Sequence, residues 1–280
     1  MKGGGLPLGS AQTHASAAGA LDTRVATSQT ASEWDELGRL FNTMLDKIAV
    51  LIQGMHDALD NVAHELRTPV ARLRASAEVA LQQVETHPAL YREALADCLE
   101  ESERLLTMLR TLMDISEAET GVMPLALEPV PLAALLAEVV DLYRYVIDER
   151  QLDVSTTAPP TVWVSADPTR LRQVIANLLD NAIKYTPPGG QIILTACQEP
   201  TGVAVHIEDT GRGMTPDELG HIWERLYRGD RSRSQRGLGL GLSLVKAVVQ
   251  VHHGAVTVSS TLGRGSRFTV RFPRLPSSRP

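Results

Sequence analysis

The chain has 280 residues, of which 43% are hydrophobic and 21% are charged, and its formal net charge is -6. The length predicts about two domains of ordinary size, and the composition excludes an intrinsically disordered chain. The mild acidity argues against a nucleic-acid partner held by bulk charge. The two cysteines, Cys98 and Cys197, lack the spacing of a disulfide framework or a zinc motif. No apolar run is long enough to span a membrane, and no signal peptide is evident, so a cytoplasmic location is expected.

The first half of the chain predicts helices. Residues 1–31 are rich in Gly, Ala, Ser and Thr and predict a flexible tail, either native or left by cloning. From residue 32 to residue 81 apolar residues recur at spacings of three and four, and the same pattern returns over 89–119 after a break at 85–88. Two long helices with full apolar stripes predict a helical hairpin, which buries both stripes best by pairing with a second copy. We therefore expect a homodimer built around a four-helix bundle.

The second half mixes strands and helices. Strands are predicted at residues 152–154, 161–164, 191–196, 203–208, 255–259 and 267–272. Helices are predicted at residues 132–150, 168–185, 215–224 and 240–252. This alternation, with hairpin-like neighbours near the end, predicts an α+β sandwich.

The first chemical motif is HELRTP, within the first long helix. His64 has a neutral imidazole at neutral pH, so one ring nitrogen can act as a nucleophile. The adjacent Glu65 can take or orient the other ring proton, and Thr68 shares a helix face with His64. A metalloprotease is excluded, because HExxH needs histidine where Thr68 stands. On the hexapeptide alone, a surface histidine with an acidic neighbour is an equal alternative.

The second motif is NLLDNAIKY. Asn177 and Asn181 lie one turn apart on one helix face. Mg²⁺ prefers oxygen ligands and keeps several waters, so one carboxamide together with nucleotide phosphates is sufficient. Lys184 adds a point charge for phosphate and Tyr185 an aromatic edge for a base. A buried structural amide pair is the alternative.

The third motif is DTGRGM, directly after the strand predicted at 203–208. Gly211 and Gly213 allow a tight turn, which would point the carboxylate of Asp209 toward a ligand. Such a carboxylate can accept from an exocyclic amine and would select adenine over guanine. Taken alone, this motif is more typical of a plain turn.

The fourth motif is a glycine loop in front of the last predicted helix. It comprises Gly237, Leu238, Gly239, Leu240 and Gly241. Alternating glycines before a helix N-terminus suit phosphate binding, although a flexible hinge has the same composition. The preceding residues 225–236 hold five arginines and predict a mobile lid that closes on polyphosphate. Neither the Rossmann nor the P-loop spacing fits.

Taken in order, these motifs resemble those of the sensor histidine kinases of two-component systems, over residues 32–275. The resemblance implies a dimeric helical hairpin followed by an α+β two-layer sandwich of the Bergerat type. The implied segments are a tail (1–31), a HAMP-like helix (32–55), a dimerisation and phosphotransfer hairpin (56–120), a catalytic ATP-binding domain (121–275) and a C-terminal tail (276–280).

The resemblance also implies a role for each motif residue. His64 would be the phosphoacceptor, Glu65 its general base, and Thr68 a residue that positions water for dephosphorylation. Asn181 would hold Mg²⁺. The residues around the nucleotide would be Asn177, Lys184, Tyr185, Asp209, Gly211 and Gly213. Arg228 and the loop 237–241 would form the lid.

The implied function is autophosphorylation of His64 from Mg-ATP, transfer to an aspartate of a response-regulator receiver domain, and the reverse phosphatase reaction. The HAMP-like segment implies a parent protein at the cytoplasmic face of the bacterial inner membrane. Two alternatives stay open: a dimeric signalling scaffold with a degenerate ATP site, and a clamp-type ATPase of the same nucleotide fold. The scaffold is favoured only by Trp223 and Leu226, which stand where the family commonly has phenylalanine.

Overall fold

The computed structural model describes residues 42–43, 45, 66–81, 88–227 and 239–273. The chain divides into two units, residues 1–63 and 64–280. In the first unit the described residues are helical. The predicted tails, most of the HAMP-like segment and most of the break at 85–88 lie outside the described residues.

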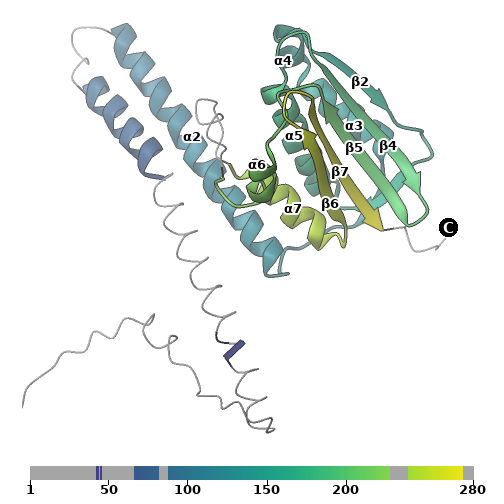
Figure 1. Ribbon diagram of the computed structural model, residues 1–280. Helices are drawn as coiled ribbons and strands as arrows, with labels where there is room; N and C mark the ends of the chain where they lie inside the picture. Colours follow the sequence, from purple (N-terminus) through teal and green to yellow (C-terminus); the bar gives the residue numbers. More distant parts are fainter. Residues whose placement is uncertain (1–41, 44, 46–65, 82–87, 228–238, 274–280) are drawn as a thin grey trace, which may run out of the picture. The chain divides into compact units, whose positions relative to one another are not determined.

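The helical hairpin is formed by residues 66–81 and by α2 (Pro88–Glu119) (Figure 1). The two helices run antiparallel side by side. The Cys98 thiol donates to the backbone oxygen of Leu73 at 3.6 Å, and one residue earlier on that helix Arg72 forms an ion pair with Glu101 at 3.4 Å. The predicted hairpin is therefore confirmed. Among the described residues, no helix is both long and apolar enough to cross a membrane.

The sandwich contains a mixed five-stranded sheet and a small two-stranded sheet. The strands are β1 (Glu128–Pro131), β2 (Asp153–Thr157), β3 (Trp163–Ala166), β4 (Gln191–Glu199), β5 (Gly202–Asp209), β6 (Ala255–Thr261) and β7 (Gly265–Pro273). The helices are α3 (Leu132–Leu142), α4 (Arg144–Glu149), α5 (Pro168–Tyr185), α6 (Pro216–His221) and α7 (Gly241–Val251). The large sheet has the order β2-β4-β5-β7-β6, with only β2 and β4 parallel, while β1 pairs with β3.

The core lies between the large sheet and one layer of helices, as Figure 1 shows. In β4, Ile192, Leu194 and Ala196 are buried, whereas the alternate residues are only half-buried. This period of two is typical of a sheet with one face packed and one face open. Helices α3, α5 and α7 contribute the facing apolar side chains. The predicted α+β two-layer sandwich is confirmed.

Two local features differ from the sequence prediction. The proline-rich stretch before the sandwich contains β1, which pairs antiparallel with β3. The helix predicted over 132–150 is divided into α3 and α4 at Tyr143, whose φ of -98° and ψ of 3° are not helical.

The C-terminal part of α2 also contacts the sandwich. Asp114 forms an ion pair with Arg170 at 2.9 Å and accepts from the Gln173 side chain at 3.2 Å. Met108 and Ile115 of the same helix are fully buried. One face of α2 is therefore covered within the chain.

Candidate functional site

Helix α5 carries the asparagine motif and is anchored at its first turn. Asp167 is its N-cap: one carboxylate oxygen accepts from the backbone N–H of Arg170 at 3.0 Å, and the other accepts from that of Ala126 at 3.0 Å. Burial acts to raise the pKa of Asp167, but the backbone donors, Thr169 included, outweigh it and lower the pKa. The carboxylate therefore stays ionised and fixes the start of α5.

His252, at the end of α7, also contacts Asp167 at the start of α5. Its Nε2 accepts from the backbone N–H of Asp167 at 3.0 Å, and its Nδ1 lies 2.8 Å from the Val248 carbonyl oxygen. These partners assign the proton to Nδ1. The ring is buried, so this histidine is a structural link between α5 and α7.

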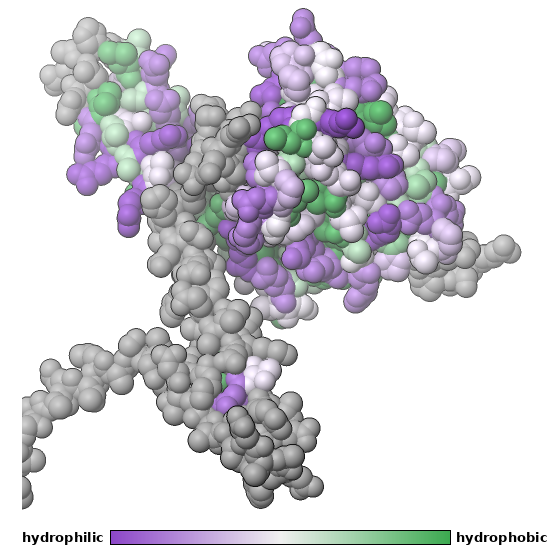
Figure 2. Space-filling model, in the orientation of Figure 1, coloured by the Kyte–Doolittle hydropathy of each residue, from purple (hydrophilic) through white to green (hydrophobic). Residues whose placement is uncertain are grey.

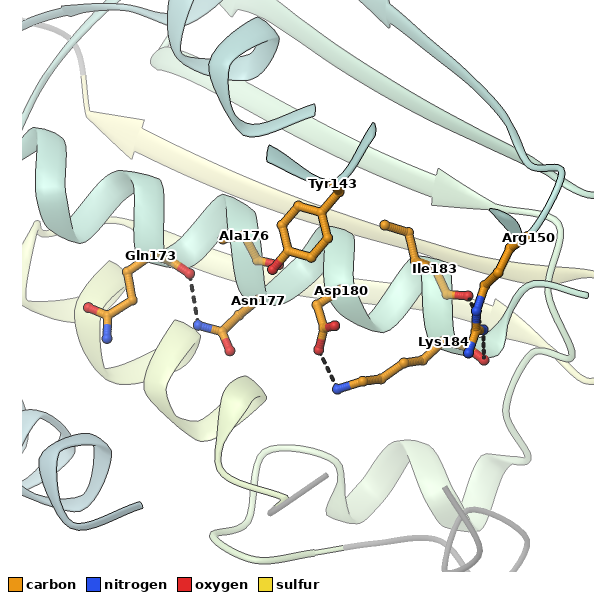
Figure 3. Close-up of polar contacts among 8 residues, drawn as sticks. All are labelled: Tyr143, Arg150, Gln173, Ala176, Asn177, Asp180, Ile183 and Lys184. Atoms are coloured by element: carbon orange, nitrogen blue, oxygen red, sulfur yellow. Dashed lines mark hydrogen bonds and ion pairs between the residues drawn. The ribbon is translucent and has the colours of Figure 1, made fainter. Parts of the chain in front are cut away.

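Asn177 faces the beginning of α7. Its side-chain nitrogen donates to the Gln173 carbonyl oxygen at 2.8 Å, which orients the carboxamide (Figure 3). A Cβ placed on Gly241 would lie only 2.8 Å from the Asn177 carboxamide oxygen. The glycine therefore lets the last glycine motif approach the asparagine motif directly.

Asn181 and Lys184 follow along the same helix. Within the described parts of the chain, the half-buried Asn181 carboxamide has no hydrogen-bond partner, so its oxygen is available to a ligand. The Lys184 ammonium group pairs with the Asp180 carboxylate one turn earlier (Figure 3). Arg150 donates to the Ile183 carbonyl oxygen at 2.9 Å and so supports the last turn of α5.

Asp209 is the last residue of β5 and points one carboxylate oxygen at the following turn. Its Oδ1 accepts from the backbone N–H groups of Gly211, at 2.8 Å, and Ser266, at 3.3 Å. Burial raises the pKa of Asp209, and these two bonds only partly offset that effect. Because both bonds use Oδ1, Oδ2 remains for a ligand.

The glycines around Asp209 are required by close backbone contacts. A Cβ on Gly211 would lie 2.5 Å from the Tyr185 carbonyl oxygen, and Gly213 has a φ of 65°. The Arg212 guanidinium lies over the Tyr185 ring, 4.8 Å from its centroid. The end of α5 and the turn after β5 thus meet at Tyr185.

Trp223 and Leu226, which stand where the resembling family commonly has phenylalanine, each have a defined contact. Trp223 packs edge-to-face on Phe268 of β7, with ring centroids 6.2 Å apart. Leu226 donates its backbone N–H to the Gly239 carbonyl oxygen at 3.0 Å. Gly239 has a φ of 67°, and Leu226 itself has a φ of 62°. The hydrophobic segment is thus docked on both the sheet and the glycine loop.

The structure therefore brings together three of the four motifs. Gly241, at the start of α7, approaches Asn177 of α5, and Gly211, in the turn after Asp209, approaches Tyr185 at the end of α5. Asn181 and Lys184 lie on α5 between these two contacts, and Gly213, Gly239 and Leu240 lie in the adjoining turns. His64, Glu65, Arg228, Gly237 and Leu238 lie outside the described residues. Thr68 is exposed in the hairpin helix.

Sequence reasoning did not identify Asp167, His252 or Arg150. The Asp-Pro pair before α5 is a capping signal that could have revealed the first. The other two act through backbone atoms of residues far away in sequence, and no local pattern indicates such contacts.

The arrangement fits Mg²⁺-bound adenine nucleotide. The Asn181 oxygen, which has no partner among the described residues, is the kind of ligand that Mg²⁺ prefers. Asp209 Oδ2 is an acceptor in a partly buried setting, which suits an exocyclic amine.

Comparison with known proteins assigns both parts of the chain. Residues 166–276 match the family described as "Histidine kinase-, DNA gyrase B-, and HSP90-like ATPase", and residues 55–121 match the "His Kinase A (phospho-acceptor) domain". The chain is 35% identical over 227 residues to Sensor protein SrrB of Staphylococcus aureus, which covers 80% of this chain and 39% of that relative. The chain thus spans well under half the length of this curated relative.

Two solved structures share the fold of this chain. Full-length ShkA in complex with AMPPNP is 28% identical with a TM-score of 0.60, covering 78% of this chain and 45% of that one. Histidine kinase ThkA in complex with response regulator protein TrrA shares the fold, at 22% identity and a TM-score of 0.60, covering 81% of this chain and 64% of that one. The two family matches follow each other along the chain in the order that the motifs predict. The chain therefore belongs to the sensor histidine kinases, a family of ATP-dependent protein-histidine kinases.

Proposed function

We propose that this chain transfers the γ-phosphoryl group of Mg-ATP to His64 and then passes it to an aspartate of a response regulator. The observation that carries the proposal is that two motifs contact the same helix: the start of α7 meets α5 at Asn177, and the turn after Asp209 meets it at Tyr185. These contacts also argue against a scaffold with a degenerate ATP site. The phosphoacceptor-type helical hairpin argues against a clamp ATPase.

Each residue has a role that follows from its surroundings. Asp209 Oδ2 would accept from the adenine amine, and Asn181 would hold Mg²⁺, which when bound neutralises charge on the phosphates. Lys184 pairs with Asp180 in this structure, and its ammonium group would have to exchange that partner to neutralise charge on the phosphates. These groups act by positioning and by electrostatics, because the transition state of phosphoryl transfer is loose.

At the hairpin, the neutral His64 imidazole would attack and Glu65 would accept or orient its remaining proton. His64 and Glu65 precede the described helix of residues 66–81 directly.

We extend the proposal to a response-regulator partner and to phosphatase activity. ThkA, a neighbour in fold, was solved with a response regulator, and Thr68 of this chain, four residues after His64 in the sequence, is exposed. Thr68→Ala should leave autophosphorylation intact and slow dephosphorylation of the regulator about 10²-fold or more, because it removes a group that orients water. Time courses with purified phosphorylated regulator test this, and equal loss of both activities would reject the role.

We also propose a homodimer, on the evidence of α2. Five apolar residues on one stripe of this helix are exposed: Leu95, Leu99, Leu106, Leu109 and Met113. Their spacings of four, seven, three and four residues follow the heptad rule. Figure 2 shows apolar side chains at the surface of the hairpin. The stripe lies away from Met108 and Ile115, which are buried within the chain.

The HAMP-like segment supports a parent protein at the inner face of the bacterial membrane. Since the chain matches only 39% of SrrB, further segments of such a parent would carry the anchor and the signal input. Fractionation of cells expressing the full-length gene tests this, and recovery of the product outside the membrane fraction would reject it.

The kinase proposal is tested by incubating the chain with γ-labelled ATP and Mg²⁺. The wild type should acquire acid-labile, base-stable label, whereas His64→Gln should acquire none while binding ATP normally. Asn181→Asp should lose Mg²⁺-dependent labelling, because a new negative charge faces the phosphates. A scaffold would bind no ATP, and a clamp ATPase would release phosphate without any labelled protein. Label retained by His64→Gln would reject the nucleophile.

A further inference from the structure

The open face of the sheet carries a cluster that takes no part in the proposed kinase site. Cys197 and Glu199 lie on β4 and His206 lies on β5, and one ligand atom from each lies within 4.8 Å of the others. The Cys197 sulfur is 3.7 Å from Nε2 of His206. All three side chains are half-buried.

The strand pairing explains why these residues meet. Cys197 and Glu199 are two residues apart, so their side chains leave β4 on the same face. His206 pairs with Thr195, which places its ring diagonally beside Cys197. The spacing of the two cysteines in the sequence does not reveal this cluster. Its three potential ligands come from two antiparallel strands, and only one of them is a cysteine.

The imidazole is already oriented for metal binding. His206 Nδ1 lies 3.0 Å from the hydroxyl oxygen of Thr269 on β7, which can accept a hydrogen bond from an Nδ1–H group. The proton-free Nε2 then faces the Cys197 sulfur. A ligand histidine held through its other nitrogen is typical of protein metal sites.

Glu199 is also held in place. Its Oε2 accepts from Arg271 Nε at 3.0 Å, which leaves Oε1 for a metal ion. The thiolate and the carboxylate would supply two negative charges, although the Arg271 ion pair already offsets that of Glu199. Metal binding would release the thiol proton to solvent.

From this geometry we propose that Cys197, His206 and Glu199 bind a Zn²⁺-like transition-metal ion, with water as the fourth ligand. Sulfur and nitrogen ligands favour such ions over Mg²⁺, which prefers oxygen. The 3.7 Å between the Cys197 sulfur and His206 Nε2 is close to the roughly 3.6 Å that separates a sulfur and a nitrogen ligand of a tetrahedral zinc ion. The bound ion would join β4 to β5, the strand that ends at Asp209.

The test uses the purified chain without a histidine tag, in excess Mg²⁺ and without nucleotide, titrated with Co²⁺ as a spectroscopic probe of a zinc site. The wild type should bind one equivalent and show thiolate-to-cobalt charge-transfer absorption in the near ultraviolet, which Zn²⁺ should displace. Cys197→Ser should abolish this absorption, and His206→Ala should weaken binding at least about tenfold.

The matched control is Cys98→Ser, which removes the other thiol and should keep the absorption. Thermal unfolding checks each variant: Zn²⁺ should raise the Tm of the wild type and of Cys98→Ser, but not that of Cys197→Ser. Absence of charge-transfer absorption in the wild type, its survival in Cys197→Ser, or its loss in Cys98→Ser would each overturn the proposal. None of these outcomes bears on the kinase proposal, whose residues lie elsewhere.

Discussion

At the scale of single residues, the closest approach between motifs is at Gly241. Gly241→Ala would place a methyl carbon only 2.8 Å from the Asn177 carboxamide oxygen. The asparagine must then turn away, so we expect ATP affinity to fall about tenfold, or ~1.4 kcal/mol, with little change in Tm.

Gly220→Ala is the matched control, because nothing lies within 4 Å of a Cβ at that position. Isothermal titration with a non-hydrolysable ATP analogue compares the two variants. Equal affinities would show that the approach of α7 to Asn177 does not shape the site.

The ionised Asp209 carboxylate should lower the stability of the fold at neutral pH while providing an acceptor for the nucleotide. Burial raises the pKa of Asp209 in the folded state above the ordinary value of 3.8, which applies to the unfolded state. At a pH between the unfolded-state pKa and the folded-state pKa, the native state therefore binds more protons than the unfolded state. Stability contributed by this group is therefore present at low pH and lost as the pH rises through the raised pKa. Asp209→Asn should be more stable than the wild type at neutral pH.

The asparagine keeps one carbonyl oxygen for Gly211 and Ser266 but presents an amide donor toward the adenine amine. Nucleotide binding should therefore be lost. Urea unfolding from about pH 4 to about pH 8 should show the stability difference growing with pH and then levelling. A variant that binds ATP normally, or that is no more stable at neutral pH, would contradict this account of Asp209.

At the scale of elements, α2 has two apolar faces, and the exposed one should form the dimer. Leu106→Lys places a charge in the exposed stripe, where Leu106 is 51% exposed, and should convert the dimer to a monomer at micromolar concentration. Thr107→Lys adds the same charge on a neighbouring exposed position outside the stripe and should leave the dimer intact. Light scattering after size exclusion distinguishes them, and a Leu106→Lys dimer would exclude this stripe as the interface.

The elements also show what a sequence can predict. The strands and helices of the sandwich have strong periodicity and lie close to their predicted ranges. The short strand β1 was not predicted, because Pro129 and Pro131 each lack an N–H, and only pairing with β3 makes the segment extended. The break at Tyr143 has no proline or glycine signal. It follows from packing, since the Tyr143 hydroxyl reaches the Ala176 carbonyl oxygen of α5 at 3.4 Å.

The candidate site was also predictable only in part. The asparagine, aspartate and glycine motifs could be located from sequence, because each needs a particular residue type at a fixed offset. The contact between His252 and Asp167, which fixes the start of α5, could not be predicted, since the two residues are 85 positions apart. The Cys197 cluster was likewise hidden, because the register of β4 and β5 decides which side chains meet.

At the scale of the whole molecule, net charge says little about function, because five of the arginines are concentrated in the short segment 225–236. The two family matches and the converging motifs place ATP binding in the sandwich and leave the phosphoacceptor to the hairpin. The central claim is therefore that the nucleophile is a ring nitrogen of His64, just before the described hairpin residues in the sequence.

The most direct test is to locate the phosphoryl group. The chain is incubated with Mg-ATP, digested with trypsin at neutral pH to preserve phosphohistidine, and sequenced by mass spectrometry. The relevant peptide follows Lys47 and ends at Arg67, and it contains both His56 and His64. Fragment ions should place the phosphoryl group on His64 alone. A phosphoryl group on His56, or an unmodified peptide from a chain that is labelled elsewhere, would contradict the account.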